Sequence, residues 1–266
     1  MEIWQALVLG LVQGLGEFLP VSSSGHLVLA REIMGISGDY MLFDIMVHVG
    51  TLFAVLVAFY KDIIALFKPP FKTIGLLLLA SVPAAVVGLL LNDTIADFFS
   101  DAKYIGFFFL FTAVLMLATE WLAVKRPYAE RELPLRVAPS VGIKAALIMG
   151  GMQAVALFPG ISRSGSTIFG GTLARSRRED VAKFSFFMSV PVILGSALLS
   201  VIDVAQTGTT VDWGVILIGM AAAFVSGLAA IKLMMRLIQK ANYKWFSLYL
   251  FVVAVLSFVF FFCLGW

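Results

Sequence analysis

The sequence predicts an all-α integral membrane protein, and three observations support this fold class. The 266 residues are 61% hydrophobic and only 13% charged, with a mean hydropathy of +1.01, whereas about a quarter of the residues of a soluble domain are charged. Several apolar runs reach the roughly 20 residues that a helix needs to cross about 30 Å of hydrocarbon. The two-residue alternation that marks an outer-membrane barrel is absent. The membrane-spanning segments are therefore expected to be helices.

An internal repeat with an offset of about 140 residues sets the order of these helices. Residues 13–25, QGLGEFLPVSSSG, align with residues 153–165, QAVALFPGISRSG, and the two stretches share Gln, Phe, two Ser and Gly. The register continues along the chain, since Leu110 aligns with Leu250. Internal duplication is typical of transporter-like folds, whose binding sites lie where the two copies meet.

The first copy, residues 1–124, begins with two apolar segments that are too short to span a membrane. As a helix, residues 2–16 would cover roughly 22 Å, and residues 23–34 would cover less. Pro20 ends the first helix, and the serines after it are good N-caps for the second. We therefore expect a re-entrant helix hairpin over about residues 2–34. Three transmembrane helices should follow, near residues 40–60, 72–92 and 102–124.

The second copy, residues 140–266, repeats this order after a linker at residues 125–139. Its re-entrant hairpin is expected at about 140–175, and its transmembrane helices near 179–202, 212–238 and 244–264. Because each copy crosses the membrane three times, the second copy must be inverted relative to the first. Basic residues gather in the loops on one side, so the positive-inside rule places the linker in the cytoplasm. The tips of the two hairpins should then meet near the middle of the membrane.

The sequences of the two hairpin tips predict a polar site that binds an anion. Unpaired backbone groups at membrane depth need partners from protein or from a water-filled cavity. Each tip also leads into a helix N-terminus, whose free N–H groups and partial positive charge favour an anion. Arg163 adds a full charge and a planar fork of donors that can hold phosphate oxygens. We therefore predict a phosphate-containing ligand.

The repeat separates positions that both copies need from positions that differ. The shared residues suit capping and turn geometry: Ser22, Ser24 and Gly25 recur as Ser162, Ser164 and Gly165. The residues that differ are the better candidates for chemistry: Glu17 stands against Leu157, Ser23 against Arg163, and His26 against Ser166.

The side chains of the first tip permit acid–base and nucleophilic chemistry. Ser23 and His26 lie three residues apart at a helix start, so they can share a face as a hydroxyl nucleophile and a general base. Gln13 and Glu17 share a face of the preceding helix. Glu17 could orient His26, bind a divalent cation that bridges phosphates, or act as the base itself.

Simpler structural roles compete with some of these assignments. Serines at helix starts are usually caps, and a histidine can make an ordinary structural hydrogen bond. An isolated carboxylate or guanidinium at membrane depth is costly, which makes function the default interpretation for Glu17 and Arg163. Asp44 and His48, one turn apart in the third helix, could either line the cavity or bond a neighbouring helix.

Two motifs resemble those of the bacterial undecaprenyl-diphosphate phosphatase family, also called the bacitracin-resistance family. Residues 13–26, QGLGEFLPVSSSGH, look like its glutamate-containing first motif, and residues 159–167, PGISRSGST, match its Pro-Gly-x-Ser-Arg-Ser-x-x-Thr motif at every fixed position. The resemblance implies an enzyme that removes the terminal phosphate of a C55 polyprenyl diphosphate, so that the monophosphate returns to cell-wall synthesis. It also implies a multi-pass protein of the bacterial plasma membrane whose active site opens to the extracytoplasmic side.

The resemblance implies roles for individual residues as well. The catalytic positions are Glu17, Ser23, His26 and Arg163. The expected substrate-binding residues are Gln13, Ser22, Ser24, Ser162, Ser164, Gly165 and Thr167. Family members depend on magnesium or calcium; because the first carboxylate of the family's Glu-x-x-x-Glu pattern is Gln13 here, Glu17 is the remaining candidate metal ligand, acting through phosphate.

Expected partners are the lipid diphosphate and the bilayer, with a homodimer left open. The basic residues behind the net charge of +3 sit at helix ends, so no nucleic-acid partner is expected. The architecture alone fits a transporter or flippase for an anionic polyprenyl phosphate equally well. The arrangement of Ser23 and His26 is the feature that favours an enzyme.

Overall fold

The structure is a computed structural model, which describes residues 1–36, 38, 40–91, 94–95, 97–98, 102–125, 128, 133, 135, 137–207, 212–238 and 242–263. The side chains of residues 203–207 and 263 are not part of this description. Most of the predicted linker at 125–139 also falls outside the described residues. Within the described ranges the chain forms helices and no strand, which confirms the all-α prediction.

The helices of the first half are two short ones followed by three long ones, with one additional short helix. They are α1 (Ile3–Phe18), α2 (Ser23–Ile33), α3 (Met41–Ala58), α4 (Tyr60–Leu66), α5 (Lys72–Leu90), the 3₁₀ turn η1 (Ala102–Tyr104) and α7 (Ile105–Lys125). The transmembrane helix predicted near 40–60 is α3, and the additional short helix α4 begins at Tyr60, directly after it.

The second half has the same order of short and long helices. It consists of α8 (Ile143–Val155), α9 (Arg163–Leu173), α10 (Arg178–Thr207), α11 (Trp213–Leu237), α12 (Lys244–Phe258) and the π-helical turn η2 (Val259–Cys263). Six segments of the described chain are long and apolar enough to cross a membrane: α3, α5, η1 with α7, α10, α11, and α12 with η2. The chain is therefore a multi-pass membrane protein, and the inverted orientation of the two halves stays a prediction.

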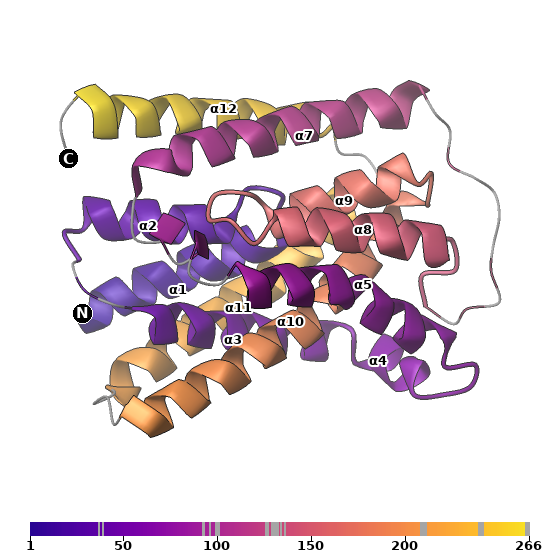
Figure 1. Ribbon diagram of the computed structural model, residues 1–266, viewed down its shortest axis with the longest axis horizontal. Coiled ribbons are helices and arrows are strands. Elements are labelled where there is room, and N and C mark those ends of the chain that lie inside the picture. The colour runs from indigo at the N-terminus through magenta and orange to yellow at the C-terminus, as the bar shows by residue number, and fades with distance from the viewer. Residues whose placement is uncertain are drawn as a thin grey trace.

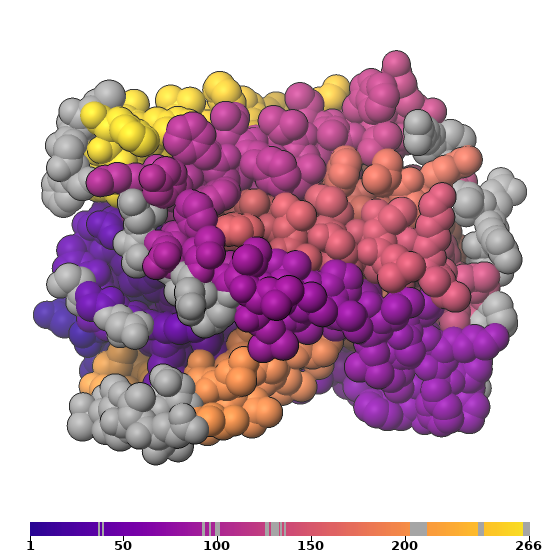
Figure 2. All heavy atoms as spheres, viewed as in Figure 1, coloured from indigo at the N-terminus to yellow at the C-terminus, as the bar shows by residue number. Residues whose placement is uncertain are grey.

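The short helices of the two hairpins lie between layers of longer helices. Figure 1 shows α1, α2, α8 and α9 between the α7–α12 pair on one side and α3 and α10 on the other. Figure 2 shows α7 and α12 along one edge of the molecule and α5 across the face toward the viewer. The outward faces of these three helices carry exposed Leu, Val, Phe and Trp side chains, as contact with lipid requires.

Small residues allow α1 to pack closely against α11. A Cβ atom built on Gly10 would overlap the carbonyl oxygen of Gly219 and approach the Cβ of Ala222 to 2.8 Å. Close approach of backbones through small residues is a common way to join helices in membranes. The contact holds the first hairpin against a long helix of the second half.

The substitution Gly10→Ala should therefore destabilise the protein by about 1–3 kcal/mol, the usual cost of overpacking. Thermal unfolding in detergent would measure this as a lower Tm. Gly195→Ala in α10 is the matched control, because a Cβ there meets no atom within 4 Å. Equal Tm values for the two variants would contradict the packing argument.

The two hairpin tips use the same N-cap. The hydroxyl of Ser22 accepts a hydrogen bond from the backbone N–H of Gly25 at 3.3 Å, and that of Ser162 accepts one from Gly165 at 3.1 Å. Ser22 reaches this position with a φ of 66°, in the left-handed region. Ser162 has a φ of −69° instead, so the two serines share the capping hydrogen bond that the repeat predicted but differ in backbone conformation.

Candidate active site

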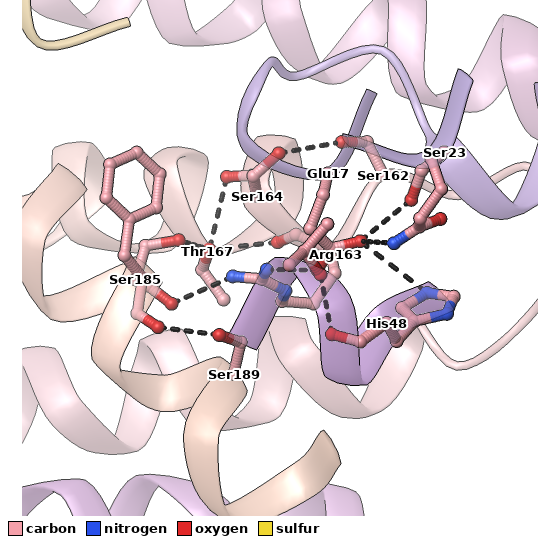
Figure 3. Close-up of polar contacts among 12 residues, drawn as sticks. Glu17, Ser23, His48, Ser162, Arg163, Ser164, Thr167, Ser185 and Ser189 are labelled. Carbon is pink, nitrogen blue, oxygen red and sulfur yellow. Dashed lines mark hydrogen bonds and ion pairs between the residues drawn. The ribbon is translucent and has the colours of Figure 1, made fainter. Parts of the chain in front are cut away.

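Glu17 lies at the centre of the polar site and connects the two hairpin tips (Figure 3). Its side chain is 6% exposed and projects from the last turn of α1. Oε1 accepts a hydrogen bond from Arg163 Nη2 at 2.6 Å, and Oε2 accepts one from Ser23 Oγ at 2.8 Å. Gln13 Nε2 also donates to Oε2, at 2.8 Å. One carboxylate thus binds a hydroxyl from the first tip and a guanidinium from the second.

Arg163 is the first residue of α9 and is bound on two sides. Besides its ion pair with Glu17, it donates from Nη1 to the backbone carbonyl of Ser185 in α10 at 2.8 Å. A guanidinium in apolar surroundings is stable only when it is paired and hydrogen-bonded. Arg163 meets both conditions, and it connects α9 to α1 and α10.

A second set of contacts joins the tips directly. Ser164 Oγ donates to the backbone carbonyl of Leu19, in the turn of the first hairpin, at 3.0 Å. Ser162 Oγ lies 3.2 Å from Ser164 Oγ. Thr167 Oγ1 lies 2.6 Å from Ser185 Oγ, so the turn is also fixed to α10. Residues about 140 positions apart in the sequence therefore form one polar cluster.

The His26 side chain faces α7 and α12 instead of Glu17. Its Nδ1 is 2.7 Å from the carbonyl oxygen of Ser22, and its Nε2 is 2.7 Å from the hydroxyl of Tyr249 in α12. The ring stacks on Tyr249 and meets Phe109 edge-on. The hydroxyl of Ser23 donates to Glu17, so the hypothesis that His26 acts as its base has no contact to support it. Spacing places two residues near one face, but each here meets a different neighbouring helix.

His48 and Asp44 follow the two different roles that the sequence left open. His48 Nε2 lies 3.5 Å from Glu17 Oε2, which places the ring at the site. The Asp44 carboxylate instead forms an ion pair with Arg31 in the last turn of α2. Sequence reasoning missed Ser185, although it aligns with Asp44 in the repeat at an offset of 141.

The donor set at Glu17 does not fit a divalent cation held by the protein. Among the described residues no group of three or more His, Cys, Asp or Glu could hold a metal ion. Both oxygens of Glu17 already accept hydrogen bonds, and the Arg163 cation at 2.6 Å would repel a second positive charge. We therefore do not assign Glu17 as a metal ligand, and a role for magnesium or calcium stays a prediction.

Comparison with known proteins identifies the family. The family of bacitracin resistance protein BacA matches residues 6–256. The undecaprenyl-diphosphatase of Carboxydothermus hydrogenoformans is 38% identical over 259 residues, which cover 96% of each chain. That of Halothermothrix orenii is 38% identical over 260 residues, covering 96% of this chain and 97% of the relative. These matches over nearly the whole length show that the chain belongs to the bacitracin resistance protein BacA family.

Proposed function

We propose that the protein hydrolyses undecaprenyl diphosphate to undecaprenyl phosphate and inorganic phosphate. Its relatives are named undecaprenyl-diphosphatase. The observation that carries the proposal is the Glu17 carboxylate, which is shared by the hydroxyl of Ser23 and the guanidinium of Arg163. A hydroxyl with its base and a fixed positive charge are the parts that phosphoryl transfer through a serine requires.

The positive charge and the backbone donors of the second tip would bind the terminal phosphate. Arg163 can turn its planar fork of donors from Glu17 and the Ser185 carbonyl to two phosphate oxygens. The N-terminus of α9 adds free N–H groups and partial positive charge beside it. Both act on the charge that the transferred phosphoryl group carries in the transition state.

The first tip would supply the nucleophile and its base. Ser23 Oγ attacks the terminal phosphorus in line, and its proton passes to Glu17 Oε2, which it already contacts at 2.8 Å. The bond from that phosphorus to the bridging oxygen breaks, and undecaprenyl phosphate leaves with the electron pair. Glu17 releases this proton before the second step and is a carboxylate again. Water then attacks the phosphoserine and gives its proton to Glu17, which passes that proton to Ser23 Oγ as phosphate leaves.

We place this reaction in the bacterial plasma membrane, with the site open to the extracytoplasmic side. The basic residues in the loops on one side of the predicted topology support this orientation. The lipid substrate would enter laterally from the outer leaflet, so that its diphosphate reaches the hairpin tips while its polyprenyl chain stays in the bilayer. A homodimer stays an open prediction.

Phosphate release by the purified protein in detergent tests the proposed function. The wild-type protein should release inorganic phosphate from undecaprenyl diphosphate without any membrane gradient, whereas a transporter or flippase would release none. Ser23→Ala should lower the rate by at least about a thousandfold, since the nucleophile is lost.

Two results would contradict parts of this account. The absence of release by the wild-type protein would favour transport of the lipid. Substantial release by Ser23→Ala would instead favour direct attack by a water molecule that Glu17 activates. Ser81→Ala is the matched control, because the Ser81 hydroxyl donates to the carbonyl of Leu77 within its own helix, α5. That variant should keep the wild-type rate.

A further inference from the structure

We propose that His48 accepts from Glu17 the proton that Ser23 loses. His48 thus acts through Glu17, as a positioning residue, and does not touch the substrate. The proposal rests on the proposed function, since it follows the proton that Ser23 loses when it attacks phosphorus. Glu17 Oε2 takes that proton, transfers it to His48 Nε2, and becomes a carboxylate again. The resulting imidazolium then releases the proton to water.

The geometry places His48 on the same oxygen as the nucleophile. Glu17 Oε2 accepts the Ser23 hydroxyl at 2.8 Å and lies 3.5 Å from His48 Nε2. Figure 3 shows Ser23 and His48 approaching this carboxylate from neighbouring elements, with Arg163 on its other oxygen. The nucleophile, the base and the imidazole therefore form a continuous path of three groups.

The backbone of α3 fixes which ring nitrogen faces Glu17. His48 Nδ1 lies 2.6 Å from the carbonyl oxygen of Asp44, one turn earlier in the helix. A carbonyl oxygen only accepts, so Nδ1 carries the hydrogen in this pair. Nε2 is left to bind or release a proton, and it is the nitrogen that points at Glu17. The ion pair of Asp44 with Arg31 ties this turn of α3 to α2.

The exposed fractions of the side chains around Glu17 indicate in which direction the proton leaves. Glu17 is 6% exposed, whereas the His48 side chain is 26% exposed. The other side chains bonded to Glu17 are more enclosed, because Gln13 and Ser23 are buried and Arg163 is 17% exposed. Among the described groups in contact with this carboxylate, His48 therefore has the largest exposed fraction, and we assign it as the exit for the proton.

The charged side chains around His48 belong to α3 itself and to the helices around it. They are Glu17 on α1, with Arg163 of α9 bound to it, and Arg31 on α2 paired with Asp44. On α10, Lys183 pairs with Asp62, which lies beyond the end of α3. The stretch of α11 beside α3, residues 213–231, carries no titratable side chain. The ionisable groups closest to His48 are therefore Glu17 and the two arginines, Arg163 and Arg31, that are paired with carboxylates.

His48→Gln tests the proposal, because glutamine keeps a polar side chain but does not titrate. In the wild-type protein kcat should rise with pH as the imidazolium loses its proton, since only the neutral ring accepts one. His48→Gln should lose this acidic limb and lower kcat by about a hundredfold, within the range of general acid–base catalysis. KM should stay within about twofold, because His48 acts through Glu17 and not on the substrate.

His26→Gln is the matched control, since His26 is the other histidine of the chain. Whatever its rate, this variant should keep the acidic limb. A second variant, His48→Ala, should regain activity when imidazole is added, provided that its Tm shows a folded protein. An unchanged pH profile and kcat in His48→Gln would overturn the inference while leaving the phosphatase proposal intact, whereas an inactive wild-type protein would overturn the phosphatase proposal itself.

Discussion

Replacing Arg163 with lysine should lower the kcat of phosphate release by about a hundredfold to a thousandfold, the usual cost of losing one preorganised donor at the reacting group. The guanidinium bonds Glu17 through one nitrogen and the Ser185 carbonyl through another. An ammonium group is a point charge on a flexible stem, so it cannot keep the planar two-nitrogen arrangement. The measurement is steady-state phosphate release by the purified variant in detergent.

Arg177→Lys is the matched control for this result. Arg177 pairs with Asp180, and its side chain is 42% exposed. Exposed ion pairs contribute little, about 0–1 kcal/mol, so this variant should keep a rate close to that of the wild-type protein. Near-normal turnover in Arg163→Lys would refute the role assigned to the guanidinium.

Replacing Glu17 with glutamine should have a larger effect, a loss of at least about a thousandfold in kcat. Glutamine has nearly the same shape, but it cannot take the proton of Ser23 and it leaves Arg163 without a counter-charge. Loss of the general base accounts for about a hundredfold to ten-thousandfold, and an uncompensated buried charge adds a stability cost. Both kcat and Tm should be measured for this variant.

Glu32→Gln is the matched control for Glu17→Gln, because it removes a carboxylate that lies outside the site. Glu32 lies near the end of α2 on its exposed side. Its substitution should change neither the rate nor the Tm appreciably. If Glu17→Gln kept more than a tenth of the wild-type rate with a normal Tm, the base would have to be another group.

The helices and the meeting of the hairpin tips could be predicted from the sequence. Apolar runs of sufficient length indicate membrane helices regardless of tertiary context. The repeat identified Glu17, Ser23 and Arg163 as positions where the two copies differ, and the structure places these three side chains in one hydrogen-bonded cluster. Pairing two buried charges follows from the cost of leaving either one alone in an apolar interior.

The partners of the histidines could not be predicted in the same way. The three-residue spacing of Ser23 and His26 fixes their separation along the helix, but Tyr249 of α12 decides where the His26 ring lies. Whether His48 or Asp44 reached the site depended on the rotation of α3, which its packing against other helices sets. Such contacts between distant segments leave no local pattern in a single sequence.

An experimental structure with a non-hydrolysable diphosphonate analogue of undecaprenyl diphosphate tests the central claim most directly. The account predicts that the terminal phosphonate lies between the two tips, within hydrogen-bonding distance of both Ser23 Oγ and the Arg163 guanidinium. The polyprenyl chain should leave this site toward the bilayer. A phosphonate bound elsewhere, with the pair of Glu17 and Arg163 undisturbed, would contradict the account.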